Sequence, residues 1–221
     1  TPKVTRPEIH PLTDKEIPLF LSAIDAHPYR NAYALCLFAG LREGECLGLS
    51  WDGVDFERGR LTIRQQLQKS KTQSSTYTVV SSTKSGKVRT IEPPAIAFDY
   101  LRAERVRQAE NRLRAGRMWS NPDDLVFTNE LGSNLIIETF RRNFKRLAAG
   151  IGRPGLRPHD LRHTCATVAI ASGADIKSVQ SLMGHATASF TLDVYAHTSE
   201  TMMQDTANRM QSYYTSLSKQ G

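Results

Sequence analysis

The sequence lacks the marks of a secreted or membrane-embedded protein. It contains only three cysteines in 221 residues, an odd number set in apolar surroundings, so we expect small core residues in a reducing cytosol rather than a disulfide framework. No apolar run approaches the roughly 20 residues that a membrane-spanning helix needs. No secretory signal pattern opens the chain, and no repeat of fixed period is visible. We therefore expect a cytoplasmic globular protein.

Positive charge exceeds negative charge by a modest margin. Lys and Arg number 29 against 22 Asp and Glu, which gives a formal net charge of +7. An excess of this size fits a polyanionic partner without requiring one. Taken alone, the densest cationic run is more typical of a solvated helix face, although only Asp160 opposes it. That run contains Arg141, Arg142, Lys145, Arg146, Arg153, Arg157 and Arg162.

Apolar spacing predicts that helices make up most of the fold. A capping box of Thr13 and Glu16 is placed to open the first helix, and Asn134 is placed to cap a later one. Gly40 is expected to stop a second helix ahead of a short restart. The expected helices cover about 13–26, 29–39, 41–49, 95–114 and 134–149.

Between residues 54 and 93 the pattern changes to the alternation that is typical of strands. Segments 61–63, 77–79 and 88–91 predict one small antiparallel sheet. Residues 84–87 predict a hairpin tip, and 69–75 predict a polar loop. The fold class expected is therefore mainly α with a small antiparallel β-sheet (α+β).

The stretch from 157 to 197 gathers reactive side chains. His159 and Arg162 are three residues apart, so they share a face if their helix begins by Asp160. A second short helix, which ends at Gly184, leads to His185, and Tyr195 follows ten residues later. Cationic groups and a phenol together form a site for an anion and a nucleophile, and phosphate is the best candidate for that anion. The first helix is expected to bury a stripe of Leu161, Cys165, Val168 and Ala169 and to end at Gly173. The second is expected to be capped by Asp175 and to bury Ile176, Val179 and Leu182.

Four motifs in a fixed order carry a family resemblance. They are AGLREGECLGLSWDGVDF from residue 39, HDLRH from 159, LMGH from 182 and DVYAH from 193. Together they resemble the catalytic signature of the tyrosine recombinases, which are the phage and conjugative-transposon integrases. The likeness extends over about residues 11–200, nearly the whole chain. It implies the catalytic-domain fold of that family.

The resemblance also implies a domain organisation. Residues 12–200 correspond to the catalytic domain, and 1–11 to a linker from a missing N-terminal DNA-binding region. Because the chain starts at Thr1 rather than Met, we expect it to be a fragment. Residues 201–221 are expected to form a tail helix that packs either on its own domain or on a neighbouring protomer. Its apolar stripe is Met203, Ala207, Met210, Tyr214 and Leu217.

The family's chemistry assigns the central roles. Strand exchange without a high-energy cofactor must conserve the phosphodiester energy, and a covalent phosphoenzyme does so. The resemblance makes Tyr195 the nucleophile, which forms a 3′-phosphotyrosine and frees a 5′-hydroxyl. It makes Arg42 and Arg162 the clamp on the negatively charged transition state, a task that suits a planar and always charged guanidinium.

Supporting roles follow from the same resemblance. The departing 5′ oxygen needs a proton, which a lysine on a hairpin can deliver. Lys84 fits the family pattern better than Lys87, because it precedes a small polar residue, so Lys87 is expected to contact DNA phosphate. His159 and His185 are expected to bond phosphate oxygens, with His159 assisting proton transfer at the tyrosine. Glu45 is expected to orient the arginine–histidine cluster.

Some of these residues have simpler explanations. His159 and His163 suggest a metal pair, but HDLRH lacks the glutamate of HExxH and has no third ligand, so we expect a packed His163, no metal and no cofactor. Arg42 alone reads as a surface arginine paired with Glu43 or Glu45. Tyr195 alone reads as a core aromatic. Tyr213 and Tyr214 are alternative nucleophiles, although no LMGH-type segment precedes them.

The predicted function is site-specific DNA recombination by a metal-free transesterification. The expected partners are double-stranded DNA and further copies of the chain in a tetrameric synapse at the bacterial nucleoid, and the resemblance also admits an accessory DNA-bending or directionality factor. Two alternatives stay open: a non-cutting DNA-binding or architectural protein on the same fold, and a type IB topoisomerase-like enzyme. The expected DNA contacts, besides Lys87, are Arg141, Arg142, Lys145 and Arg146.

Overall fold

The computed structural model describes residues 10–70, 77–80, 88–184 and 210–211. Within these ranges no helix is both long and apolar enough to cross a membrane. The helices are α1 (Glu16–Ile24), α2 (Arg30–Phe38), α3 (Glu43–Leu47), α4 (Ile96–Ala115), α5 (Ile137–Gly150), α6 (Pro158–Ala171) and α7 (Ile176–Met183), with 3₁₀ turns η1 (Trp51–Gly53) and η2 (Gly116–Met118). The strands are β1 (Val54–Asp55), β2 (Arg60–Ile63), β3 (Gln66–Lys69), β4 (Tyr77–Val80) and β5 (Arg89–Ile91).

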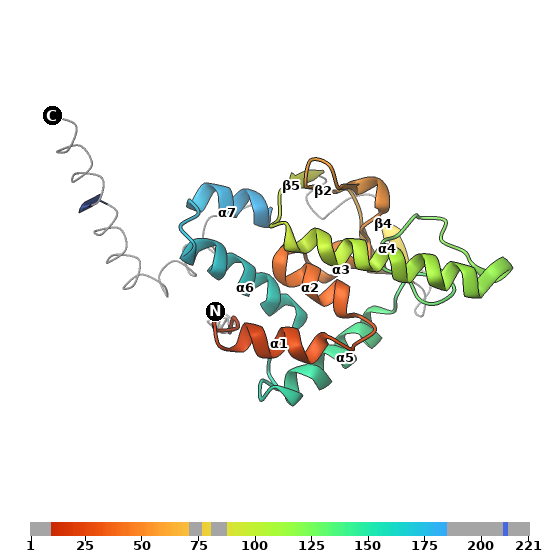
Figure 1. Ribbon diagram of the computed structural model, residues 1–221, viewed down its shortest axis with the longest axis horizontal. Helices are drawn as coiled ribbons and strands as arrows, with labels where there is room; N and C mark the ends of the chain where they lie inside the picture. Colours follow the sequence, from red (N-terminus) through yellow and green to blue (C-terminus); the bar gives the residue numbers. More distant parts are fainter. Residues whose placement is uncertain (1–9, 71–76, 81–87, 185–209, 212–221) are drawn as a thin grey trace, which may run out of the picture.

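Helix α2 lies at the centre of the helical part (Figure 1), where it contacts α4 and α6. An aromatic cluster joins α1, α2 and α5: the ring of Tyr33 lies 4.5 Å from that of Phe140 and 5.3 Å from that of Phe144, which is 5.9 Å from Phe20. The Tyr33 hydroxyl donates to the Phe140 carbonyl (2.8 Å), so this buried phenol is satisfied. The cluster fixes α5 beneath the rest of the molecule.

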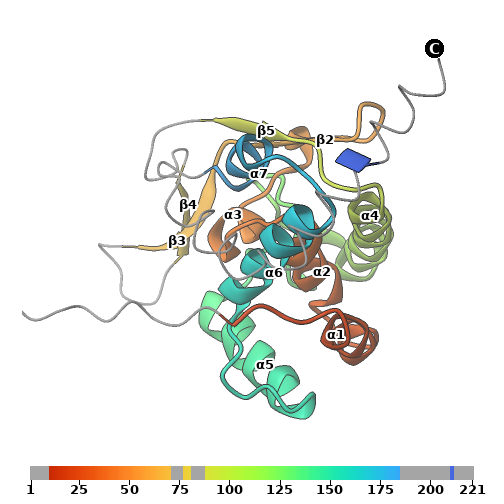
Figure 2. The same cartoon turned by 90° about the vertical axis from the view of Figure 1, so that its left-hand side faces the viewer.

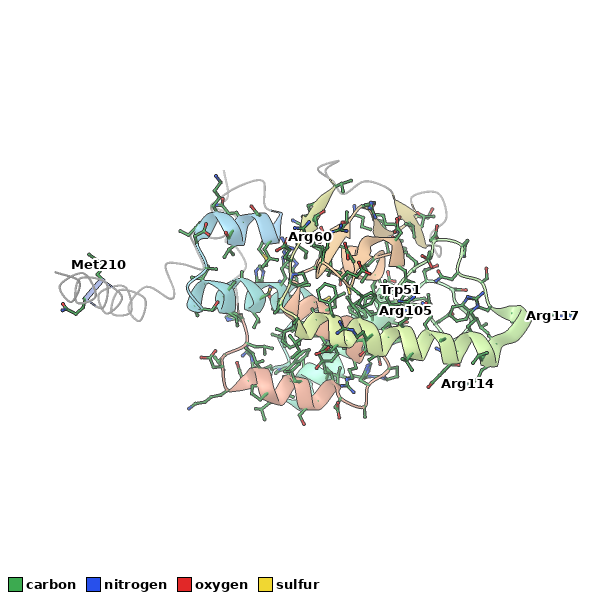
Figure 3. All side chains as sticks on the ribbon, turned by 45° about the horizontal axis from the view of Figure 1, so that its top comes forward. Trp51, Arg60, Arg105, Arg114, Arg117 and Met210 are labelled. Atoms are coloured by element: carbon green, nitrogen blue, oxygen red, sulfur yellow. The ribbon has the colours of Figure 1, made fainter. Side chains whose placement is uncertain are left out.

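Helix α4, the longest of the described helices, packs against α2. Its first half buries Ala97, Phe98 and Leu101. Its charged side carries arginines along its length, and Figure 3 shows Arg114 and Arg117 at its far end. The strongly charged helix that the sequence predicts for this region is confirmed within one residue at each end.

The strands form two sheets instead of the single sheet that the alternation predicts. Strands β1, β2 and β5 make one antiparallel sheet, in which Thr62 pairs with Thr90, and β3 and β4 make another. Strand β3 is diverted because it docks on α3: a Cβ on Gly48 would lie 2.6 Å from the Leu67 nitrogen, and one on Gly44 2.9 Å from the Leu67 carbonyl oxygen. Only glycine permits this approach. The prediction of a small antiparallel component within a mainly helical fold is confirmed.

Most expected helix ends are confirmed. Asp175 caps α7 by accepting from the Ser178 backbone N–H (2.9 Å). Only half of the expected capping box is present: the Thr13 backbone N–H donates to Glu16 (2.8 Å), but Lys15 is the N-cap of α1 and the helix begins at Glu16. Gly40 and Gly184 stand at helix ends with φ of +61° and +57°, a conformation that suits glycine.

Two local predictions are wrong. Asn134 does not cap α5: it pairs with Thr128 in an isolated bridge, and the helix begins three residues later after Ile136, which has no side-chain cap. Val168 is 43% exposed rather than buried, because the apolar side of α6 turns toward α2 and α7 and leaves Val168 outside. Cys36, Cys46 and Cys165 are free and buried, as expected.

Candidate functional site

Arg42 stands at the start of α3, directly after the turn at Gly40. Its backbone N–H donates to Glu45 Oε2 (3.0 Å), and its Nη1 donates to Glu45 Oε1 (2.7 Å). Arg42 is thus the N-cap residue of α3, and Glu45, the third residue of the helix, accepts from both its backbone and its side chain. The Arg42 side chain is 40% exposed, so one edge of the guanidinium faces outward while Glu45 holds the other.

Glu45 is 1% exposed and is neutralised by a second arginine that our sequence reasoning missed. Arg89, on β5, donates from Nη1 to Oε1 (2.8 Å) and from Nη2 to Oε2 (2.7 Å) of Glu45. Burial alone would raise the pKa of Glu45, but the bonds and charge of Arg89, followed by those of Arg42, hold that pKa at about 2. The carboxylate is therefore ionised at any physiological pH.

A signal for Arg89 does exist in the sequence. Arg89 and Ile91 are two residues apart on a strand, so they point to the same face, and Ile91 is buried. An arginine on the buried face of a strand requires a carboxylate partner.

Arg162 is fully buried in the first half of α6. Its Nη1 donates to the Gly40 carbonyl (2.5 Å) and its Nη2 to the Met183 carbonyl. Its Nε–H is buried and has no partner among the described residues. Burial, and then the charge of Arg42, lower the pKa of Arg162 to about 9, so the guanidinium still carries its charge at neutral pH.

His159 and His163 lie one turn apart on α6. His159 is exposed at the first turn, and its ring meets that of His163 edge to face at a centroid distance of 4.6 Å. Desolvation and the nearby charge of Arg162 lower the pKa of His159. Burial and the neighbouring His159 lower the pKa of His163 to about 4. Both imidazoles are therefore neutral at pH 7, and the described residues contain no group of three His, Cys, Asp or Glu that could hold a metal.

A groove of about 910 Å³ opens beside Arg42 and His159. Its walls come from α3, β3, α5 and the start of α6, which lie on one side of the molecule in Figure 2. Four further cations line it, together with Glu43 and Glu138. They are Lys69, Arg141, Lys145 and Arg157.

The four predicted DNA contacts on α5 are all exposed but differ in position. Arg141 and Lys145 line the groove, whereas Arg142 and Arg146 are not part of its wall. Arg141 forms a two-pronged ion pair with Glu43, in which its Nε lies 2.9 and 3.0 Å from the two carboxylate oxygens.

The structure thus brings together Arg42, Glu45, His159 and Arg162 of the predicted site. The other predicted residues lie outside the described ranges: Lys84, Lys87, His185 and Tyr195, and with them Tyr213 and Tyr214. Gly184 is the last described residue before His185, and its backbone packs on the Arg89 side chain: a Cβ there would lie 2.7 Å from Arg89 Cδ. His185 follows directly in the sequence.

Comparisons with known proteins concern the family and the fold of the chain. The model of the phage integrase family matches residues 10–202. A XerC-like tyrosine recombinase of Caldanaerobacter subterraneus subsp. tengcongensis is 31% identical over 199 residues, which cover 86% of this chain and 51% of the relative. The integrase of Mycobacterium phage FRAT1 is 28% identical over 180 residues, 81% of this chain and 51% of the phage protein. The chain therefore spans about half the length of the curated relatives it matches.

A solved structure shows the same fold. The Tn1549 transposon integrase in complex with transposon right end DNA superimposes with a TM-score of 0.74 at 23% identity, covering 94% of this chain and 68% of the integrase chain. The family match and the shared fold confirm the resemblance to tyrosine recombinases that the sequence motifs indicate. The chain belongs to the phage integrase family of tyrosine recombinases.

Proposed function

We propose that this chain is the catalytic domain of a site-specific recombinase that cuts and rejoins double-stranded DNA through a phosphotyrosine at Tyr195. One observation carries the proposal: two charged arginines lie close together beside a basic groove. Arg162 donates to the carbonyl of Gly40, two residues before Arg42, and Arg42 lines the groove while the buried Glu45 holds it. Two like charges placed close together do not help folding, whereas both can stabilise a bound phosphodiester.

The geometry suits the transition state of phosphoryl transfer. Negative charge gathers on the non-bridging oxygens, and donors fixed beforehand stabilise it without reorganisation. Arg42 offers the outward edge of its guanidinium, and Arg162 offers its unpaired Nε–H. His159 is neutral, because its pKa is lowered, so it can accept a proton as the phenol of Tyr195 attacks.

The remaining steps use residues outside the described ranges. Lys84 would donate a proton to the departing 5′ oxygen, and His185 would bond the same phosphate as the arginines. When the freed 5′-hydroxyl of a new strand attacks the phosphotyrosine, Tyr195 leaves as the phenol and the phosphodiester is restored. The guanidinium groups supply the positive charge, so we propose that the step needs no metal.

The groove is the proposed seat of the DNA backbone. Lys145 and Arg141 from α5 and Arg157 from α6 line the same groove wall as His159. Such contacts fix the position of the duplex without reading its sequence. Lys87, Arg142 and Arg146 are proposed to add to the attraction from outside the groove.

We also propose that the protein works as a homo-oligomer on DNA, in which residues 201–221 pack on a neighbouring copy. Met210, which belongs to the apolar stripe of that segment, is 53% exposed in this single chain. Deleting residues 203–221 should weaken assembly on DNA without loss of a cooperative thermal melt. Loss of the melt would place the segment in its own core.

A suicide DNA substrate tests the catalytic proposal. It is nicked so that the freed end diffuses away, which traps the covalent intermediate. The protein should form a denaturation-resistant adduct in the presence of EDTA, and peptide mapping should place the DNA on Tyr195. Tyr195→Phe should bind DNA without forming the adduct, while Tyr213→Phe and Tyr214→Phe should still form it. An adduct that survives in Tyr195→Phe would overturn the assignment, and DNA binding without any adduct would favour a non-cutting protein.

A further inference from the structure

Arg89 is a largely buried cation that contacts the predicted site residue Glu45 but is not itself among the predicted site residues. Its side chain is 14% exposed, against 40% for Arg42. It forms two parallel bonds to both oxygens of Glu45, while Arg42 reaches the same carboxylate with one Nη and its backbone N–H. The carboxylate is therefore occupied chiefly by Arg89.

This sharing has a consequence for Arg42. Glu45 Oε1 accepts from Arg42 and from Arg89 at once, at 2.7 and 2.8 Å. A buried carboxylate that lost Arg89 would leave a charge in low dielectric with a single cation beside it. Arg42, which is free to move at its exposed edge, would then be drawn onto both oxygens in the two-pronged geometry that guanidinium and carboxylate prefer.

Arg89 also lies between the two segments that lead to the other predicted site residues. It is the first residue of β5, where it pairs with Ile63 of β2, and residues 81–87 with Lys84 come just before it in the sequence. Its stem fills the space above Gly184, which immediately precedes His185. One side chain thus contacts Glu45, which holds Arg42, and the residue next to His185.

We propose that Arg89 is a positioning residue that saturates Glu45 so that the outward edge of Arg42 stays available to the DNA phosphate. The inference deepens the proposed function and rests on it. Arg89 does not touch the phosphate itself; it acts through Glu45 on the direction in which Arg42 points. A small misplacement of such a clamp costs about 100-fold in rate, so the expected effect lies on catalysis and not on affinity.

The matched control is Arg60 on β2 of the same sheet. It also forms an arginine–carboxylate pair, Nε to Glu92 at 2.8 Å, but both side chains are exposed. Arg60 is labelled in Figure 3. Arg89→Met should slow single-turnover cleavage at saturating DNA about 100-fold with an unchanged Kd, whereas Arg60→Met should leave both values at those of the unaltered protein.

A double-mutant cycle separates positioning from a general structural role. If Arg89 acts through Glu45, then Arg89→Met should add little to the slow cleavage of Glu45→Gln. Independent, multiplying losses in the double variant would overturn the proposal.

A readout without DNA decides the inference even if the protein cleaves nothing. Phenylglyoxal modifies accessible arginines, and mass spectrometry locates the product. Arg42 should be modified more slowly in Arg89→Met than in the unaltered protein, because Glu45 now holds both of its Nη groups. Unchanged modification of Arg42 would overturn the proposal. If the unaltered protein forms no adduct, the proposed function fails while this readout still stands.

A conservative variant tests the proposal even if Arg89→Met does not fold. Arg89→Lys keeps the charge beside Glu45 but cannot form two parallel bonds, because lysine is a point charge on a flexible stem. It should melt close to the unaltered protein, with cleavage and Arg42 modification both reduced to intermediate rates. If Arg89→Met fails to fold and Arg89→Lys leaves both rates unchanged, Arg89 is only structural and the proposal is wrong.

Discussion

Two groups of cations in this molecule use the same residue types in opposite ways. The more buried group consists of Arg42 and Arg89, which bind Glu45, and the fully buried Arg162; we call it the arginine cluster. The exposed group consists of Arg141, Arg142, Lys145 and Arg146 on α5, and we call it the basic face. Each arginine of the cluster is fixed by a buried carboxylate or by backbone carbonyls, whereas Arg141 of the basic face is 56% exposed and is held by Glu43, which is 23% exposed.

The contrast shows what burial contributes. In low dielectric a charge acts strongly and over a short range, and its direction is set by its partners. At the surface, water and salt weaken each charge, so the cations add up to a diffuse attraction for a polyanion. We therefore expect the arginine cluster to control the rate of cleavage and the basic face to control the affinity for DNA.

The largest effect should come from Arg162→Lys. Lysine keeps the charge but cannot reach the carbonyls of Gly40 and Met183 and also offer an N–H to phosphate. We expect single-turnover cleavage to fall about 100- to 1,000-fold, as when a fixed transition-state donor is removed, with DNA binding retained in a gel-shift assay. The same exchange on the basic face, Arg146→Lys, should change neither value. An equal loss in both variants would erase the distinction between the two groups.

The next effect is a pH dependence of stability that comes from Glu45. Its pKa in the folded protein is about 2, below the ordinary value of 4.5, so its stabilisation is present above pH 4.5 and is lost as the pH falls toward 2. The shift corresponds to about 3 kcal/mol of unfolding free energy. Urea unfolding over this pH range should show a steeper acid loss in the unaltered protein than in Glu45→Gln. Parallel curves would contradict the strong pairing of Glu45 with its arginines.

A smaller effect is expected from the basic face. Replacing both Lys145 and Arg146 by alanine should weaken DNA binding and lower the salt dependence of log Kd by about 2, since each phosphate contact contributes about 0.9 to that slope. Cleavage at saturating DNA should be unchanged. Binding isotherms at several salt concentrations measure the first result, and a reduced rate at saturation would show that α5 also shapes the catalytic site.

The smallest effect should come from Glu43→Gln. Glu43 occupies Arg141 in an exposed ion pair, and such pairs contribute at most about 1 kcal/mol. Its removal frees Arg141 for DNA, so affinity should rise by up to about fivefold at low salt and less at high salt. Affinity that falls instead would mean that Glu43 positions Arg141 for the backbone.

The sequence predicted well what depends on local spacing. Motif order indicated the family, and Gly40, Asp175 and Gly184 marked helix ends because capping depends on neighbouring residues. The pairing of Arg42 with Glu45 joins residues three apart, a spacing that the sequence makes visible.

Contacts between distant segments were not predictable in the same way. The pair of Arg141 and Glu43 joins residues 98 positions apart, and that of Arg89 and Glu45 joins residues 44 apart. The two-sheet arrangement arises because β3 docks on Gly44 and Gly48, which no strand pattern reveals. Asn134 has the right residue type for a cap, but it is used in a bridge to Thr128.

We expect the arginine cluster to act on the charge of the scissile phosphate. Replacing that phosphate by a methylphosphonate removes one negative charge and with it most of the need for a positive clamp. Arg42→Ala should cleave ordinary DNA far more slowly than the unaltered protein does, yet the two should cleave methylphosphonate DNA at similar single-turnover rates. Lys145→Ala should match the unaltered protein on both substrates at saturation. If Arg42→Ala were slowed equally on both, Arg42 would not act on the phosphate charge, and the account would be contradicted.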